Sequence, residues 1–314
     1  MDFTDVFDDL FVIAHEMIKG RGEDNYYCAH CKRSAILSVF DGCGGLGAQA
    51  YDSFQGHTGA YMASRIASGA VHDWYHDNYR RTWRDVRSFA ESLKDYIMKG
   101  YEVCTAEAQS NLRLRGSMVR DFPTTAAISF AQPDAAGISL FVVWAGDSRV
   151  YLMDRKGLAQ LSRDDVEGED TLSNLSNDGV LTNLLSADGR FVLHTKCLHI
   201  TEPSVVFAAT DGCFGYIPTP MEFEYLLLSE LLSASCPKEF KRNLGKQIGE
   251  YAGDDYALGM IGMYFGSFSN MQRFFRNRMR LLEEKYVLPL QTGRKTVDVN
   301  AMWQEYRRDY ERYL

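Results

Sequence analysis

The sequence predicts an α+β fold, because short apolar strands come in runs and amphipathic helices lie between those runs. Segments rich in Val, Ile, Leu and Phe predict strands. They cover residues 35–40, 125–130, 139–145, 150–153, 204–209 and 258–265. Helical periodicity covers residues 59–77, 84–112, 220–234 and 237–250. This order favours α+β over a strict βαβ alternation.

The C-terminal residues 267–314 are predicted as a helical extension behind a domain of residues 1–266. The extension carries ten Lys and Arg against six Asp and Glu, whereas the whole chain carries 34 against 42. Apolar residues at helical spacing predict two helices, with a break near Pro289 and Gly293. We expect the aromatic side chains of the extension to pack on the body or on one another. A contact with a protein partner is the alternative.

Composition and charge exclude several classes of protein. A net charge of −8 argues against binding along a phosphate backbone, so we expect no nucleic-acid partner. The longest apolar stretch, residues 138–145, is far shorter than a membrane-spanning helix, and the acidic N-terminus lacks the basic start of a secretory signal. The Cys count is odd, at seven, which indicates reduced thiols and a cytoplasmic location without a membrane contact.

Two motifs have alternative interpretations that we consider weak. Cys28 and Cys31 have the spacing of a zinc half-site, but no second pair of similar spacing follows, so a polar hairpin tip with incidental thiols is favoured. The glycines between Gly42 and Gly47 fit a dinucleotide-binding pattern. That interpretation would direct the carboxylate of Asp41 at a pyrophosphate, and no ribose-binding acid follows at the expected distance.

Acidic residues stand at the ends of four predicted strands. Asp41, Asp147 and Asp211 each follow a strand and adjoin a Gly, and Asp254 with Asp255 precedes the last strand of the body. Buried carboxylates are costly to desolvate and repel one another unless a cation lies between them. An all-oxygen set without His or thiolate favours Mg²⁺ or Mn²⁺ over zinc. The sequence therefore predicts a divalent metal centre where these strand ends meet.

A centre of this kind predicts a reaction class. A bridging carboxylate would hold two cations and lower the pKa of a shared water, which could then attack a phosphorus atom in line. Gly42 could add its backbone carbonyl as an oxygen ligand, because a glycine lets the chain approach a metal closely. Phosphoester hydrolysis would then need no Ser or Cys nucleophile.

The motifs in order resemble the metal-dependent Ser/Thr phosphatases of the protein phosphatase 2C (PPM) type, in a bacterial-like variant. They are Glu23-Asp24-Asn25, Asp41-Gly42-Cys43-Gly44-Gly45, Pro123-Thr124-Thr125-Ala126, Gly146-Asp147-Ser148-Arg149, Asp211-Gly212 and Asp254-Asp255. The resemblance covers about residues 10–266. It implies a central antiparallel β-sandwich flanked by helices, in an α-β-β-α order, with the metals at one end.

The resemblance also implies a role for each matched residue. Asp41 would bridge two metals, and Asp41 and Asp211 would be the catalytic carboxylates. Asp254 would complete a site with Asp211, and Asp255 would stand where the family usually has Asn. The remaining ligands would be Glu23, Asp24, the Gly42 carbonyl and, for a third and weaker cation, Asp147.

The chain departs from the family pattern at three places. Cys43 stands where the family often has a His that could act as a general acid. The Arg that usually precedes the acidic pair and binds phosphate is missing, and Lys19 and Arg21 are the nearest candidates. Residues 46–57 delay the helix that normally follows.

The predicted function is a cytoplasmic Mn²⁺- or Mg²⁺-dependent phosphatase that acts on phosphoserine or phosphothreonine in proteins, with a cognate Ser/Thr kinase as a further partner. The alternative is a catalytically weak pseudophosphatase that binds phosphoproteins as a scaffold. Cys43 favours that alternative, but every expected ligand carboxylate is present.

Overall fold

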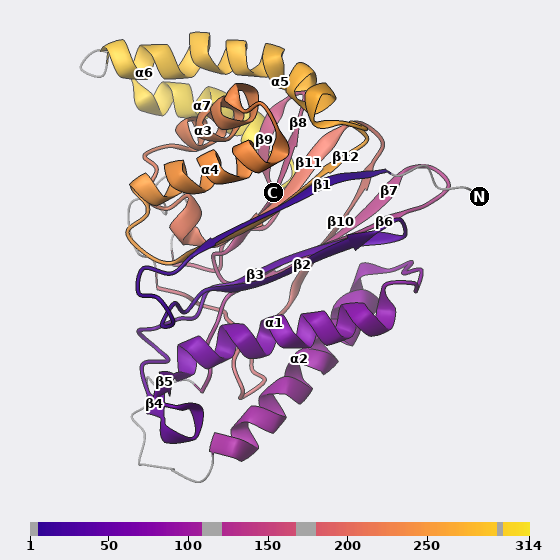
Figure 1. Cartoon of the computed structure of the whole chain (residues 1–314), viewed down its shortest axis with the longest axis vertical. Helices are drawn as coiled ribbons and strands as arrows, with labels where there is room; N and C mark the ends of the chain where they lie inside the picture. Colours follow the sequence, from indigo (N-terminus) through magenta and orange to yellow (C-terminus); the bar gives the residue numbers. More distant parts are fainter. Residues whose placement is uncertain (1–5, 109–120, 168–179, 294–297) are drawn as a thin grey trace.

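Two antiparallel sheets of five strands each stack face to face, with helices on both outer surfaces (Figure 1). The structure, a computed structural model of the whole chain, describes residues 6–108, 121–167, 180–293 and 298–314. The first sheet has the order β1 (Phe7–His15), β12 (Tyr256–Met263), β11 (Ser204–Ala209), β8 (Arg149–Asp154) and β9 (Gly157–Gln160). The second has the order β10 (His194–Ile200), β7 (Ile138–Ala145), β6 (Ala126–Pro133), β3 (Ser34–Phe40) and β2 (Asn25–Cys31). The predicted α+β sandwich with flanking helices is confirmed.

The central core lies between the two sheets. Strands β3 and β12 are buried along their whole length, as expected for strands covered on both faces. Alternate side chains from one sheet meet those from the other, including Leu37 and Val142 from the second sheet and Val206 and Ile261 from the first. This packing fixes the two sheets against each other, so the loops at their ends are held at fixed relative positions.

Two helices cover the outer face of the second sheet. Helix α1 (Gly59–Asn78) begins after the small hairpin of β4 (Ala50–Tyr51) and β5 (His57–Thr58), and α2 (Val86–Ala108) follows it. Trp74 of α1 is fully buried and packs edge-on against Phe89 of α2 and Phe130 of β6. The last part of the expected second helix, 109–112, lies outside the described residues.

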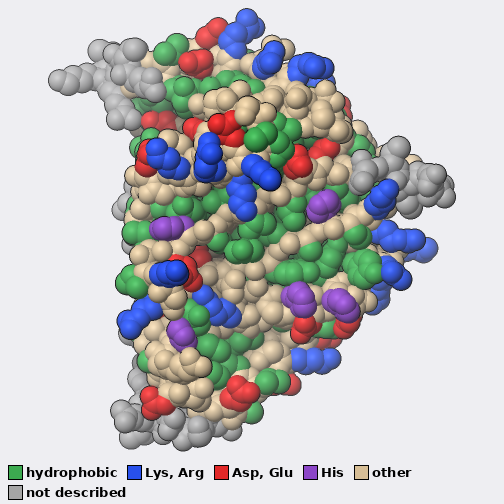
Figure 2. Space-filling view, in the orientation of Figure 1, with side chains coloured by type: hydrophobic (Ala, Val, Ile, Leu, Met, Phe, Trp, Pro, Cys, Tyr) green, Lys and Arg blue, Asp and Glu red, His purple; other side chains and the backbone are tan. Residues whose placement is uncertain are grey.

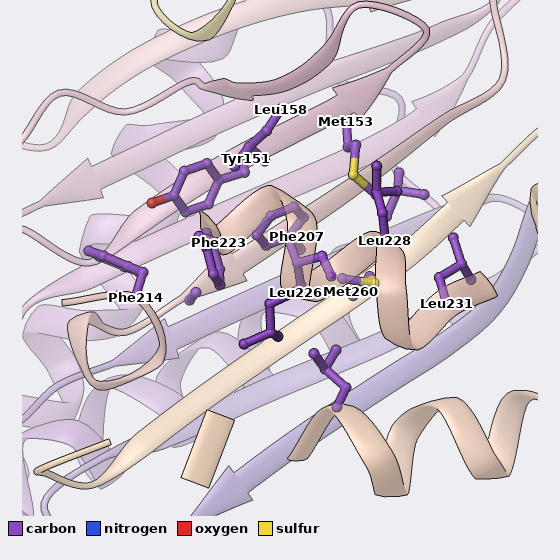
Figure 3. Close-up of a cluster of buried hydrophobic side chains, with 14 of the residues drawn as sticks. Tyr151, Met153, Leu158, Phe207, Phe214, Phe223, Leu226, Leu228, Leu231 and Met260 are labelled. Atoms are coloured by element: carbon purple, nitrogen blue, oxygen red, sulfur yellow. The ribbon is translucent and has the colours of Figure 1, made fainter. Parts of the chain in front are cut away.

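Helices α3 (Pro220–Ser233) and α4 (Pro237–Tyr251) cover the outer face of the first sheet. Figure 3 shows Leu226, Leu228 and Leu231 of α3 in one cluster with Phe207 and Met260 of the sheet. No helix in the described ranges combines the length and the apolar composition needed to cross a membrane.

The C-terminal helices continue this same outer layer. They are α5 (Phe268–Leu282), a π-helical turn η5 (Glu283–Val287), α6 (Leu288–Gly293) and α7 (Val299–Tyr310). Their buried side chains, among them Phe275, Trp303 and Tyr310, belong to the same hydrophobic cluster as Phe207 of the sheet. The expected packing of these aromatic residues on the body is therefore observed. Lys and Arg side chains lie on the outer surface over these helices (Figure 2).

A buried ion pair joins the extension to the body. The Arg278 guanidinium donates from Nε and Nη2 to the two carboxylate oxygens of Glu224 in α3, at 2.6 and 2.7 Å. Glu224 is fully buried, and Tyr306 of α7 donates a further hydrogen bond to it at 2.7 Å. Gly157, in the β8–β9 turn at φ +95°, leaves room for the guanidinium, because a Cβ there would lie 2.3 Å from the Arg278 Cζ.

Candidate metal centre

Strand register brings the predicted acidic residues to one end of the sandwich. In the second sheet, Phe40 pairs with Asn25, and Ala145 pairs with Ala126. In the first sheet, Ala209 pairs with both Arg149 and Leu258. The acidic residues lie within four positions of these paired residues along the chain. They are Glu23, Asp24, Asp41, Asp147, Asp211 and Asp254.

Carboxylates from the two sheets are close enough to repel one another. Burial raises the pKa of Asp41 well above its usual range, and the nearby charges of Asp24, Asp211, Asp147 and Asp254 raise it further. Burial likewise raises the pKa of Asp24, to which Asp211 adds. The pKa of Asp147 rises to about 7 because of burial, Asp211 and Asp164. Such a set is stable in its ionised form only with cations between the carboxylates.

Glycines let the loops of this end approach one another closely. A Cβ on Gly42 would lie 2.5 Å from the Ala60 carbonyl oxygen and 2.8 Å from that of Glu23. A Cβ on Gly212 would lie 2.0 Å from the carbonyl oxygen of Asp255. Any side chain at either position would push Asp41 or Asp211 away from its neighbours, which explains why a glycine follows each of these acids.

The donor chemistry of the centre fits divalent cations. In the described residues, the Asp24 Oδ2 and Asp147 Oδ1 atoms are buried without a hydrogen-bond partner. Unsatisfied carboxylate oxygens are costly to bury, and hard cations such as Mg²⁺ or Mn²⁺ bind oxygen donors. Across the described ranges, no three His, Cys, Asp or Glu side chains are already arranged to hold an ion. The carboxylates therefore gather around the centre without forming a finished coordination cage.

Asp254 and Asp255 have different surroundings. Asp254 is exposed, and its Oδ1 accepts the backbone N–H of Asp255 at 2.7 Å. Asp255 is buried, and its two oxygens accept the backbone N–H groups of Met17 and Glu23, each at 2.7 Å. Asp255 thus holds the loop that carries Glu23, while Asp254 faces solvent beside the acidic cluster.

A pocket of about 500 Å³ opens beside the acidic cluster and contains two cationic side chains. Asp24, Lys19 and Arg65 line it, together with Glu16 and Tyr256 among others. The guanidinium of Arg65 stacks 3.3 Å from the centroid of the Tyr61 ring. Burial raises the pKa of Glu23, and the Arg65 charge offsets part of that rise. Of the two predicted phosphate-binding residues, Lys19 lines this pocket, and Arg21 is exposed on the same loop.

The cysteine thiols have separate environments. Cys43 lies beside the acidic cluster, where burial and the charges of Asp41 and Asp147 raise the pKa of its thiol well above the usual range. Its Sγ donates a weak hydrogen bond to the Asp41 carbonyl at 3.8 Å. Cys28 and Cys31 lie in β2 and are three residues apart, so their side chains leave opposite faces of the strand. This arrangement agrees with incidental thiols.

Three residues that support the site have no role in the sequence-based prediction, although Thr125 belongs to one of its motifs. The Thr58 hydroxyl caps α1 and donates to Glu23 at 2.5 Å. Thr125 shares a hydrogen bond of 2.6 Å with Ser148, and its Oγ1 accepts the Asp41 N–H at 3.2 Å. Arg65 is the third. The predicted helix of residues 59–77 places Tyr61 and Arg65 on one face, but this periodicity does not indicate that the face meets the acidic cluster.

Several solved structures with a similar arrangement of sheets and helices are bacterial Ser/Thr phosphatases. The phosphatase PstP/Ppp of Mycobacterium tuberculosis has a TM-score of 0.56 and 17% identity, and the match covers 82% of this chain and 98% of that one. The chain has the PPM phosphatase fold. Stp1 of Staphylococcus aureus has a TM-score of 0.58 at 14% identity, covering 81% and 94%, and the PPM phosphatase MsPP of Mycobacterium smegmatis has 0.54 at 12%, covering 82% and 98%.

One further match, the PstP catalytic domain in complex with two manganese ions, has a TM-score of 0.52 and 16% identity over 82% of this chain and 98% of that one. No protein-family model and no curated protein sequence matches the chain. At these identities the PPM likeness concerns the fold. The resemblance predicted from the ordered motifs is confirmed at that level.

Proposed function

We propose that the chain is a Mn²⁺- or Mg²⁺-dependent phosphoprotein phosphatase that hydrolyses phosphoserine and phosphothreonine esters. The observation that carries the proposal is the convergence of carboxylates from both sheets at one end of a PPM-type sandwich, where they raise one another's pKa. The two manganese ions in the PstP match support metal dependence.

Each residue of the centre receives a role in this proposal. Asp41 would bridge two cations, with the carbonyl of Gly42 beside it. Asp211 and Asp254 would serve one cation, Glu23 and Asp24 the other, and Asp147 a third and weaker one. When bound, such cations supply Lewis-acid activation of water and neutralise the charge of phosphoryl oxygens.

The pocket supplies the substrate contacts. Lys19 and Arg65 would bind the phosphate oxygens, because both line the pocket that also contains Asp24. The Arg65 guanidinium is held in place before substrate arrives by stacking on Tyr61 and by an ion pair of 3.5 Å with Glu16, which lines the same pocket. The phosphorylated segment of a protein, modified by a Ser/Thr kinase, is the substrate class that this arrangement fits.

The proposal is tested by comparing the rate of p-nitrophenyl phosphate hydrolysis in Mn²⁺ with the rate in EDTA, where we expect the activity to be lost. Asp41→Asn and Asp211→Asn keep the side-chain volume and should lower kcat by at least about 100-fold, since they remove oxygen ligands. Asp134→Asn is the matched control. Asp134 follows the C-terminal end of β6, whereas Thr125 of the site precedes its N-terminal end, so Asp134 lies at the opposite end of the strand from the acidic cluster. Phosphoserine, phosphothreonine and phosphotyrosine peptides then define the substrate class.

The same assays distinguish the pseudophosphatase alternative. A folded wild-type protein that hydrolyses neither the chromogenic ester nor any phosphopeptide with Mn²⁺ would contradict the enzymatic proposal. Binding of phosphopeptides by that inactive protein, measured by calorimetry, would then support the scaffold function.

A further inference from the structure

The C-terminal helix α7 reaches a buried polar network beside the metal centre. Tyr310, the last residue of α7, is 1% exposed and donates to the Gln160 side chain at 3.0 Å. Its hydroxyl also accepts a hydrogen bond of 3.5 Å from the Arg149 Nη1. Gln160 ends β9 and Arg149 begins β8, so the tyrosine contacts two neighbouring strands at the end of the sheet that carries the acidic cluster.

Arg149 and Gln160 share one buried carboxylate. Asp164 accepts from the Arg149 Nε at 3.0 Å and Nη2 at 2.6 Å, and from the Gln160 Nε2 at 3.0 Å. The side chains of Arg149 and Asp164 are 2% and 6% exposed. Because all these groups are buried, loss of the Tyr310 hydroxyl would leave the Gln160 Oε1 without the hydrogen bond that it accepts. It would also remove one of the two hydroxyl partners of the Arg149 Nη1, the other being Tyr151 at 3.3 Å.

This network adjoins the loop of residues 146–148. Arg149 directly follows Ser148, and the Ser148 hydroxyl bonds to Thr125, which in turn accepts the N–H of Asp41. The Asp147 side chain lies within electrostatic range of both Asp164 and Arg149. A displacement of Arg149 and Asp164 would therefore change both the position and the charge environment of Asp147.

We propose that α7 positions the 146–148 loop of the metal centre, with Tyr310 as a positioning residue that acts through Arg149 and Gln160. The inference rests on the proposed metal-dependent function. In this proposal the C-terminal extension supports metal binding, whereas the sequence alone leaves contact with a protein partner as its alternative role. The cation held through Asp147 is the one that this coupling controls.

Tyr306 provides a matched control. It lies one turn earlier on α7, is 2% exposed, and donates its hydroxyl to Glu224 at 2.7 Å. Tyr306→Phe and Tyr310→Phe thus each remove one buried hydroxyl from the same helix. Only Tyr310 contacts the network that adjoins Asp147, so a purely structural role would lower the melting temperature of both variants without changing the metal affinity of either.

The experiment measures Mn²⁺ binding directly, by the electron paramagnetic resonance signal of free Mn²⁺, alongside ester hydrolysis at increasing Mn²⁺. We expect Tyr310→Phe to raise the Mn²⁺ concentration for half-saturation of the weakest site by about three- to tenfold. Tyr306→Phe should stay within about twofold of wild type. Gln160→Met is the second variant: it removes the acceptor of Tyr310 together with the donor to Asp164 and Ser162, and we expect a shift at least as large.

Coincident Mn²⁺ titrations of wild type and folded Tyr310→Phe, or equal shifts in Tyr306→Phe and Tyr310→Phe, would overturn the inference. A wild-type protein that binds no Mn²⁺ would overturn it together with the metal centre. A wild-type protein that binds Mn²⁺ but hydrolyses no ester would contradict only the proposed function. The titrations of the two tyrosine variants would then still decide the coupling.

Discussion

Individual side chains at the pocket determine how a phosphate group would be held. Lys19 and Arg65 both line the pocket beside Asp24, whereas Arg21 is exposed on the same loop as Lys19. Lys19→Met and Arg65→Met should each lower kcat/KM for p-nitrophenyl phosphate by about 10- to 100-fold, because each removes a charged hydrogen-bond donor to phosphate. Steady-state kinetics with saturating Mn²⁺ measure this effect.

Arg21→Met is the control for this prediction, since it removes a cation from the same loop without removing a pocket side chain. We expect kcat/KM within about twofold of wild type, as for most exposed substitutions. A larger loss in Arg21→Met than in Lys19→Met would assign phosphate binding to Arg21 instead.

Asp147 makes the stability of the metal-free protein depend on pH. The pKa of the Asp147 carboxyl is about 7 in the folded state and 3.8 in the unfolded chain. Between pH 3.8 and pH 7 the folded state therefore binds a proton at this carboxyl that the unfolded chain does not bind. Stability from this group is therefore present near pH 4 and is lost as pH rises towards 7. Asp147→Asn should remove that loss and stabilise the metal-free protein at pH 7.5 by on the order of 2 kcal/mol.

Urea unfolding in EDTA at pH 5.5 and 7.5 checks this prediction. Asp95→Asn, at an exposed position of α2, is the control and should leave the pH dependence unchanged. Mn²⁺ should stabilise wild type more at pH 7.5 than at pH 5.5, because protons compete with metal for the same carboxylates. Destabilisation by Asp147→Asn in EDTA at pH 7.5 would contradict this account.

At the scale of elements, the Arg278–Glu224 pair connects α5 to α3. Arg278→Met leaves the fully buried Glu224 without its cation, so we expect a loss of about 3–5 kcal/mol in the free energy of unfolding. Glu224→Leu in the same chain removes the unpaired charge and should restore most of that stability. Denaturant unfolding of the single and double variants measures both effects. A double variant as unstable as Arg278→Met would show that the pair contributes through its geometry.

The strands that the sequence predicts are the inner strands of the two large sheets, and the edge strands of these sheets are missed. All six expected strands occupy inner positions of the two sheets, where continuous Val, Ile, Leu and Phe runs are buried on both faces. Four of the missed strands, β1, β9, β10 and β2, are the edge strands of these sheets, and the other two, β4 and β5, form the separate two-residue hairpin. β2 and β10 are partly exposed and mix polar with apolar residues, and β9 has four residues, so their local patterns are weak.

The candidate site likewise contains residues that the sequence predicts and residues that it does not. Its acidic residues follow buried strands, so their grouping could be predicted from strand ends and from the order of the motifs. Arg65 and Thr58 reach the site from α1. Their contribution depends on how the helix lies across the second sheet, which no local pattern in the sequence specifies.

At the scale of the whole molecule, the extension is continuous with the hydrophobic layer outside the first sheet. Its buried side chains share one cluster with those of α3, α4 and the sheet. They are Phe268, Met271, Phe275, Leu282, Tyr286, Val287, Leu290, Trp303, Tyr306 and Tyr310. The charge contrast that marks residues 267–314 as a separate segment therefore describes the outer surface, while the inner surface of the same helices belongs to the core.

Deletion of residues 267–314 should consequently abolish folding of the rest of the chain. Each buried apolar side chain of this size contributes about 1.5–3 kcal/mol, and a domain has only about 5–15 kcal/mol in total. Deletion would also leave Glu224 buried without Arg278 and Tyr306. Circular dichroism and the yield of soluble protein measure the outcome.

The control keeps the packing and removes the charge. Arg273, Arg276 and Arg280 are exposed on α5, so replacing all three by Gln should leave the melting temperature within a few degrees of wild type. If the positive charge rather than the apolar face of the extension mattered for folding, the triple variant would unfold as well as the truncated chain. A soluble, cooperatively unfolding chain of residues 1–266 would show instead that the body is an independent domain, because its outer layer would then be stable without the buried side chains of the extension.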